Sequence, residues 1–173
     1  MDAGKDAEKK VSEGENLTKV HVDLPNHWAT GGEFIWAVDL SGDLYEIRNV
    51  PFYAYDLNYG DVVRATSDTS DLIPEVKEVV RRSGHNTLRL FFKESVDQSR
   101  SLELLATLRL LSASYEGLNN FYFALDLEPE AGVAEVRDVL DIWEKHGLIE
   151  YETCEARIQG GFDAAPERDL EDT

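Results

Sequence analysis

The sequence predicts an α+β protein in which a small antiparallel β-barrel-like half is followed by a ferredoxin-like βαββαβ half, packed as one compact unit. Up to residue 84, short apolar stretches alternate with turn residues roughly every eight to twelve positions, which is typical of a small barrel or sandwich. From residue 85, two stretches with helical periodicity lie between strand-like stretches. The 173 residues, 42% of them hydrophobic, suffice for one domain with a core or for two small packed halves.

The first half is predicted to consist of successive strands. Residues 18–24 alternate between apolar and polar side chains, which predicts a strand with one buried face. Residues 33–40 carry apolar side chains on both faces, which predicts burial on both sides. The two faces hold Phe34, Trp36 and Val38 on one side and Ile35 and Ala37 on the other. A Gly-containing turn at 41–43 predicts a hairpin to residues 44–50, and two further strands are expected at 61–66 and 74–83.

The second half contains stretches with strand periodicity and stretches with helical periodicity. Strands are expected at residues 86–92, 114–118, 119–127 and 148–156. A helix is expected at 99–113, and a second at 131–146 with Gly147 at its C-terminal end. The apolar stripes of the two helices comprise Leu104, Leu105, Leu108 and Leu111, and Val133, Val136, Val139, Leu140 and Trp143. The order strand, helix, strand, strand, helix, strand is that of the ferredoxin-like arrangement.

Four segments follow from these patterns. Residues 1–17 are expected to be a disordered tail, 18–84 the β half, 85–156 the ferredoxin-like half and 157–173 a flexible acidic tail. The net charge is −18, and the two tails hold only −2 and −3 of it, so residues 18–156 carry −13. The acidity therefore belongs to the folded part. Such a field repels nucleic acid and anionic membranes and attracts basic partners, although general solubility or a salt-rich cytoplasm explains it equally.

Several classes of function find no support in the sequence. There is no apolar run long enough to span a bilayer and no secretory signal, and the single cysteine, Cys154, is consistent with a reducing cytoplasm. His21, His27 and His146 stand alone, without metal-ligand spacing, so neither a metal site nor a cofactor is predicted. The nucleotide-binding and hydrolase motifs with glycine-rich signatures do not occur. Cys154 is interpreted as a structural thiol in a strand.

The segment "NVPFYAY" at 49–55 supplies the first candidate binding residues. Pro51 ends the preceding strand, so Asn49, Phe52, Tyr53 and Tyr55 lie in an aromatic-rich turn. Two interpretations stay open: these rings cover the end of a barrel, or they face a ligand or partner.

The next candidates lie in two later turns. Gly60 and Asp61 form a tight entry into a strand, in which Asp61 accepts backbone hydrogen bonds unless a second acid or base lies beside it. The segment "SGHNTLR" brings together the candidate binding residues Ser83, His85, Thr87 and Arg89. It is the strongest candidate for a small-molecule or anion site, because a histidine side chain and polar neighbours share one loop, and an unperturbed histidine changes charge near neutral pH. The alternative is an ordinary turn, in which the local arginines pair with carboxylates.

Four motifs occur in a fixed order: "EFIWAV" at 33–38, "NVPFYAY" at 49–55, "YGDVV" at 59–63 and "RSGHNTLRL" at 82–90. Together they resemble a bacterial family of domains of unknown function of about this length. The resemblance covers roughly residues 20–156 and implies no activity. The signature that it implies consists of Asn49, Pro51, Phe52, Gly60, Asp61, Ser83, Gly84, Thr87 and Arg89. Its glycines and proline are also what turn geometry requires.

Two hypotheses for function follow. The first is a non-enzymatic cytoplasmic protein whose acidic surface binds a basic protein, as an inhibitor, an immunity protein or a nucleic-acid mimic does. The second is a small-molecule or hydrolytic site between the two halves, lined by the NVPFYAY, GD and SGHNT segments. The second hypothesis requires His85 to lie near Asp61 and Tyr53.

Overall fold

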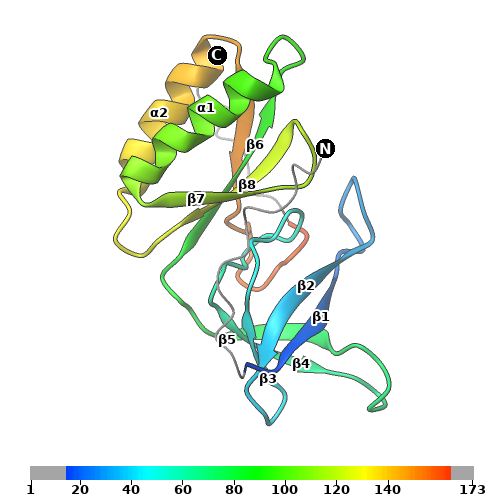
Figure 1. Ribbon diagram of the computed structural model, residues 1–173. Coiled ribbons are helices and arrows are strands. Elements are labelled where there is room, and N and C mark those ends of the chain that lie inside the picture. The colour runs from blue at the N-terminus through cyan, green and yellow to red at the C-terminus, as the bar shows by residue number, and fades with distance from the viewer. Residues whose placement is uncertain (1–14, 165–173) are drawn as a thin grey trace.

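The computed structural model describes residues 15–164 and contains two sheets and two α-helices (Figure 1). The predicted α+β class, with two antiparallel sheets and two helices, is confirmed. In Figure 1 the barrel lies at one end of the molecule and the helices at the other, with the second sheet and the connecting loops between them. None of the helices in the described range is long and apolar enough to cross a bilayer.

The first five strands form a closed barrel. They are β1 (Leu17–Asp23), β2 (Gly32–Asp39), β3 (Leu44–Ile47), β4 (Val62–Thr66) and β5 (Glu75–Arg81). Neighbours in sequence pair antiparallel. The barrel is closed by a parallel pair between β1 and β5 at His21 and Glu75, so the expected antiparallel sheet contains one parallel contact.

One face of each strand lines the barrel interior. In β2, Ile35 and Ala37 point inward and are fully buried, as the alternation requires. The prediction that β2 is buried on both faces is wrong, because Phe34 is 60% exposed and Trp36 46% exposed. On this outer face, His21 lies beside Phe34 and Lys19 lies over Trp36. A closed barrel has a single interior, so Phe34 and Trp36 face outward, although Val38 on the same parity is only 7% exposed.

The second half contains the remaining elements. They are β6 (Asn86–Phe92), α1 (Gln98–Leu108), a 3₁₀ turn (Arg109–Leu111), β7 (Ala113–Gly117), β8 (Tyr122–Leu127), α2 (Val133–Lys145) and β9 (Ile149–Thr153). The strand order is β7-β8-β6-β9, and all pairs are antiparallel. Asp97 caps α1 by accepting the N–H of Arg100 at 2.8 Å. Gly147 follows α2 with a φ of +71°, which confirms the expected helix-ending glycine.

The two faces of this sheet differ. Leu88, Leu90 and Phe92 of β6 point to the face covered by both helices and belong to the core there. Strand alternation places Thr87, Arg89 and Phe91 on the opposite face, which we call the open face. Two hydrogen bonds connect this open face to the barrel half. Thr87 Oγ1 donates to Asn58, and the Tyr122 hydroxyl donates to the carbonyl of Phe52. The open face is therefore a side of the sheet that contacts the barrel half.

The segment after β9 returns to the barrel half. Phe162 is buried in the barrel core, and its carbonyl accepts the N–H of Tyr55 at 2.6 Å. The carbonyl of Cys154 accepts the N–H of Asp56 at 2.7 Å. Within the expected flexible tail from residue 157, Phe162 is buried in the barrel core, while 165–173 lie outside the described residues. At the other end, β1 begins at Leu17, inside the expected tail, and residues 1–14 lie outside the described range.

Candidate functional site

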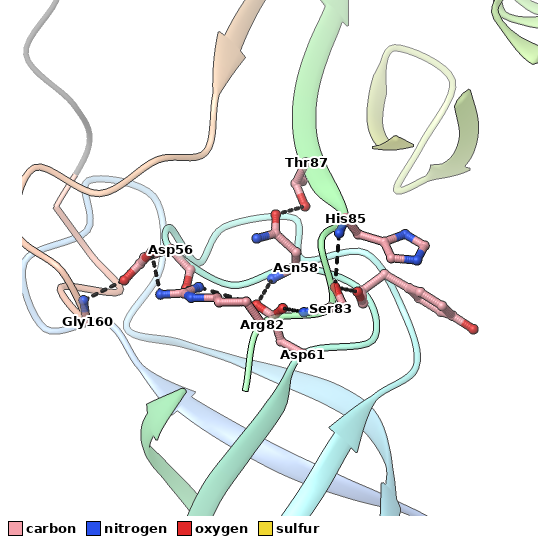
Figure 2. Close-up of polar contacts among 9 residues, drawn as sticks. Asp56, Asn58, Asp61, Arg82, Ser83, His85, Thr87 and Gly160 are labelled. Atoms are coloured by element: carbon pink, nitrogen blue, oxygen red, sulfur yellow. Dashed lines mark hydrogen bonds and ion pairs between the residues drawn. The ribbon is translucent and has the colours of Figure 1, made fainter. Parts of the chain in front are cut away.

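The nine predicted binding residues fall into three groups in the structure. Asp61, Ser83, His85 and Thr87 lie in one hydrogen-bonded network, which also contains Asp56, Asn58 and Arg82 and which we call the polar joint (Figure 2). Phe52, Tyr53, Tyr55 and Arg89 lie around a separate pocket. Asn49 belongs to neither group: its Oδ1 accepts the backbone N–H of Trp36 at 2.7 Å, so it fixes the turn after β3.

Asp61 is the centre of the polar joint. Its carboxylate is fully buried and accepts the backbone N–H groups of Asn58 at 3.0 Å and Ser83 at 2.8 Å. Arg82 donates to the same carboxylate at 3.3 Å and also pairs with Asp56 at 2.8 Å (Figure 2). Gly60 precedes it with a φ of +77°, as the tight strand entry requires. Every polar atom of this carboxylate is used to hold the turn against β5.

The hydroxyl of Ser83 is also committed to the backbone. It donates to the carbonyl of Tyr59 at 2.7 Å and accepts the N–H of His85 at 3.1 Å (Figure 2). His85 Nδ1 lies 2.6 Å from a carboxylate oxygen of the buried Asp126. His85 therefore has an acid partner, but the Ser83 hydroxyl bonds to the backbone N–H of His85 and not to its imidazole, as a nucleophile and base would require. Thr87 completes the joint by donating to Asn58 at 2.9 Å.

The pocket lies on the open face of the second sheet and has a volume of about 370 Å³. We call it the aromatic pocket. It is lined by His27, Trp28, Ala29, Tyr53, Arg89, Leu90, Phe91, Leu118, Asn119, Tyr122, Glu150, Tyr151 and Glu152. The rings of His27 and Tyr53 are 5.7 Å apart, and those of Tyr53 and Tyr122 are 6.2 Å apart. The barrel half and the sheet half thus contribute adjoining aromatic walls.

Arg89 is the cation of the aromatic pocket, and only 1% of it is exposed. Its Nε donates to Glu152 at 3.0 Å and its Nη1 to the carbonyl of Ala54 at 3.0 Å. Its guanidinium carbon lies 4.6 Å from the centre of the Tyr55 ring. Its Nη2 is buried and has no hydrogen-bond partner among residues 15–164. Buried donors are nearly always paired, so this nitrogen needs an explanation.

Glu33 holds the wall of the aromatic pocket that the NVPFYAY segment forms. Its carboxylate accepts the N–H groups of Phe52 at 2.6 Å, Tyr53 at 3.0 Å and Ala54 at 2.9 Å. No sequence motif predicts this role for Glu33, although Glu33 has the same strand parity as the inward-facing Ile35. An acid on the buried face of an apolar strand needs hydrogen-bond donors, and the neighbouring turn supplies them.

Three other pocket residues were also missed as ligand-facing groups. In the sequence, His27 stands alone, Trp28 belongs to no motif, and Tyr122 lies within the expected strand at 119–127. The Tyr122 ring lies 5.9 Å from that of Phe52 and covers the same turn. These residues come from segments far apart in the chain, and no local pattern predicts that they meet.

Burial shifts the pKa of several titratable groups in and next to the pocket. Close to Arg89 but outside the lining, burial raises the pKa of Tyr55 to about 12 and that of Cys154 to about 12, so both stay protonated. Burial, and then the charge of Arg89, lowers the pKa of His27, which favours its neutral form. Burial acts to lower the pKa of Arg89, but its neighbours, Glu152 among them, raise it, so the guanidinium remains charged.

Metal ligands do not gather at either group of residues. In the part of the chain that the structure describes, no cluster of three or more His, Cys, Asp or Glu side chains is placed to hold a metal ion.

Comparison with known proteins gives a family and a fold. A family model described as "Domain of unknown function (DUF4265)" matches residues 33–151. A solved structure described as a hypothetical protein from Neisseria gonorrhoeae is similar, with a TM-score of 0.67 and 14% sequence identity. The match covers 80% of this chain and 95% of that one, and at this identity it speaks to the fold alone. No curated protein matches the sequence.

Proposed function

We propose that this chain, which belongs to the DUF4265 family, is a binding module that holds a small organic molecule in the aromatic pocket between its two halves. The observation that carries the proposal is a pocket of about 370 Å³ whose lining comes from both halves, with the adjoining rings of His27, Tyr53 and Tyr122 on its walls.

The size and lining of the aromatic pocket support the same proposal. Its volume of about 370 Å³ falls within the range of roughly 300–1,000 Å³ typical of small-molecule sites. Such sites combine apolar walls with a few fixed polar groups. Here Tyr53, Phe91 and Tyr122 supply the walls and Arg89 and Glu152 supply the polar groups.

The chemistry in and around the pocket favours binding over hydrolysis. Outside the lining but close to Arg89, the thiol of Cys154 and the hydroxyl of Tyr55 each have a pKa raised by burial to about 12, so they are poor nucleophiles and poor bases at neutral pH. Glu152 already accepts hydrogen bonds from Arg89 and Tyr55, which fixes its position rather than leaving it to activate water. The imidazole of His85 is paired with Asp126 in the polar joint and is not among the residues lining the pocket.

The test is two-dimensional NMR of the full chain titrated with a set of uncharged, anionic and cationic aromatic compounds. The reporter is the indole N–H of Trp28, a residue that lines the pocket and has 90% of its surface exposed. We expect shifts for Trp28 and the pocket tyrosines with members of the set, and their loss in Arg89→Met. The control is Arg81→Met, an exposed arginine of the barrel that does not line the pocket. Absence of any shift at the pocket across the whole set would contradict the proposal.

A second candidate is an acidic protein that binds a basic partner, as an inhibitor or immunity-like protein does. The observation that favours it is the charge of −13 on residues 18–156. Exposed acidic side chains recur on the outward side of α2, at Glu135, Asp138, Asp141 and Glu144. An acidic surface of this kind accelerates association with a basic partner and makes binding depend on salt.

This candidate is tested by affinity capture from a cell lysate with elution in a salt gradient. We compare the natural chain with a variant in which the four α2 acids are replaced by the corresponding amides. A basic protein that the natural chain retains and the amide variant releases would support the candidate. Equal retention by both chains would contradict a role for α2.

We also infer the division of the chain at residue 84 into a β half and a ferredoxin-like half. The strand order β7-β8-β6-β9 with α1 and α2 on one face supports the assignment of residues 85–156 as a ferredoxin-like unit. A cytoplasmic location agrees with the single buried thiol of Cys154.

A further inference from the structure

Large apolar side chains lie exposed around the aromatic pocket. Trp28 is 90% exposed, Leu118 is 46% exposed, and Phe91 and Phe121 are each 45% exposed. Trp28, Phe91 and Leu118 line the pocket, and the ring of Phe121 lies 6.3 Å from that of Phe91. These four residues therefore adjoin one another around a single opening, and we call them the apolar rim.

The apolar rim is wider than the pocket itself. Phe121 is not among the lining residues, so a molecule confined to the pocket leaves its ring in water. Single exposed apolar side chains are ordinary on soluble proteins, whereas adjoining ones mark interaction sites. Aromatic residues are also enriched in the buried centre of protein interfaces. The pocket and its rim together thus have the composition of a protein-binding surface.

Internal contacts hold the rim in place. The loop between β1 and β2 extends from the barrel toward the loop between β7 and β8, and both line the pocket (Figure 1). In the first loop, Asn26 donates its backbone and side-chain N–H groups to Asp163, at 2.9 Å each. In the second, the side-chain oxygen of Asn119 accepts the N–H groups of Phe121 and Tyr122, also at 2.9 Å. A preformed surface of this kind costs little ordering when a partner binds.

The charges beside the rim favour a basic partner. Three carboxylates lie at the pocket or next to it, those of Glu150, Glu152 and Asp163. Two cations, Lys93 and the buried Arg89, pair with the first two, so three negative and two positive charges leave a local net charge of −1. The whole chain carries −18. This field attracts lysine and arginine side chains and repels nucleic acid, anionic membranes and a second copy of the same chain.

We propose that the aromatic pocket and the apolar rim together bind a segment of another protein in which a large apolar side chain is flanked by lysine or arginine residues. The apolar side chain enters the pocket, and the neighbouring part of the segment packs on Trp28 and Phe121. The basic side chains lie toward the acids beside the rim. This inference rests on the proposed function, because the same pocket receives an organic group, and it names a protein segment as the carrier of that group.

The experiment is isothermal titration of the full chain with capped peptides of the form KKGXGKK, in which X is tryptophan, phenylalanine, leucine or alanine. The same anchors are also presented between glutamates, as EEGXGEE, and as the free N-acetyl amides. We expect the lysine-flanked peptides with a large apolar X to bind, and the alanine peptide to bind at least tenfold more weakly. The glutamate-flanked peptides and the free amides are expected to bind at least tenfold more weakly at low salt. The difference between lysine and glutamate flanks should narrow as salt is added.

Matched aromatic variants connect the binding to the rim. Trp28→Ala is expected to weaken peptide binding at least tenfold, whereas Trp36→Ala, an exposed tryptophan on the outer face of the barrel, leaves it unchanged. Phe121→Ala should weaken binding of the peptides but not of the free N-acetyl amides, because Phe121 lies outside the pocket lining. Phe34→Ala, an exposed phenylalanine of the barrel, is the control for that variant.

A matched pair of acids tests the charge. Glu150 lines the pocket and pairs with Lys93, and Glu78 of β5 forms a similar exposed pair with Arg64 on the barrel. Glu150→Gln is expected to reduce the preference for lysine over glutamate flanks about threefold, the size of an exposed charge pair. Glu78→Gln is expected to leave that preference unchanged.

The outcomes separate this inference from the proposed function. Equal binding of lysine-flanked and glutamate-flanked peptides would overturn the choice of a basic partner. If the free N-acetyl amides bind as tightly as the peptides, or Phe121→Ala changes neither, the protein segment is overturned while the pocket remains a small-molecule site. If no lysine-flanked peptide binds at millimolar concentration, the inference is overturned, and if the aromatic compounds also fail to bind, the proposed function falls with it.

Discussion

The polar joint and the aromatic pocket both lie between the two halves, but they differ in how completely their buried polar atoms are paired. In the polar joint, the buried carboxylate of Asp61 accepts three hydrogen bonds and the Ser83 hydroxyl both donates and accepts. In the aromatic pocket, the buried guanidinium of Arg89 leaves Nη2 without a partner in residues 15–164. The saturated network stabilises the fold, whereas the volume of about 370 Å³ between the halves lies at the aromatic pocket.

Replacement of Asp61 by alanine is expected to have the largest effect on stability. It leaves the N–H groups of Asn58 and Ser83 and one arm of Arg82 without their acceptor. We expect a loss of about 3 kcal/mol in the free energy of unfolding, measured by urea denaturation. The exposed Asp68→Ala, in the loop after β4, is the matched control and is expected to change it by less than about 0.5 kcal/mol. A loss below about 1 kcal/mol would show that the joint is not a structural network.

Glu33→Gln is expected to affect both the stability of the fold and binding in the aromatic pocket. The amide oxygen of glutamine can still accept hydrogen bonds from the turn. The amide N–H₂ group, however, replaces the second carboxylate oxygen and places donors against backbone N–H donors. We expect a loss of about 2 kcal/mol in urea denaturation and, because the turn carries Tyr53, weaker binding in the aromatic pocket. The exposed Glu94→Gln serves as the control. Unchanged binding in a destabilised Glu33→Gln would separate the turn from the pocket.

Arg89→Met is expected to weaken ligand binding strongly and to lower stability only slightly, in contrast to Asp61→Ala. The change removes an unpaired donor along with the hydrogen bonds to Glu152 and Ala54, and Glu152 is exposed enough to be hydrated alone. We expect a loss of only about 1 kcal/mol in the free energy of unfolding, since a buried ion pair contributes little net stability. Ligand binding falls at least tenfold. A loss as large as that of Asp61→Ala would place Arg89 with the structural network instead.

The smallest expected effect is the pH dependence of stability that His27 causes. Its folded pKa is lowered by burial and by Arg89, with Glu152 and Asp163 acting in the opposite direction. The unfolded chain therefore takes up the proton first as the pH falls below about 6.5, so stability is lost between that pH and the lowered folded pKa. The natural chain should lose stability relative to His27→Gln over this window, measured as melting temperature against pH. Parallel curves for the two chains would contradict the shift.

The elements of the fold were predictable because they depend on local patterns. The strand at 86–92, the two helices and the glycine after α2 follow from period and capping alone. The exposure of Phe34 and Trp36 was not predictable in this way, since it depends on whether a second layer packs on the barrel. The same applies to Phe162, whose burial depends on the return of the chain to the first half.

The candidate site was predictable only in part. Tyr53, Tyr55 and Arg89 lie in segments that stood out for their aromatic and basic content. Trp28 and Tyr122 join them through the register of strands and the placement of a loop, which a single sequence does not encode locally. The polar joint was close to the predicted site in composition but differs in role, because its hydrogen bonds are internal.

The place of Phe162 has a consequence for how the chain is made. This residue completes the core of the barrel, yet it is synthesised after the whole of the second half. During translation the barrel strands leave the ribosome first but lack one side chain of their interior until the last part of the described chain emerges. Domains usually fold in the order of synthesis. Here the first half reaches its final packing only after the second half has been made, so the two halves mature together.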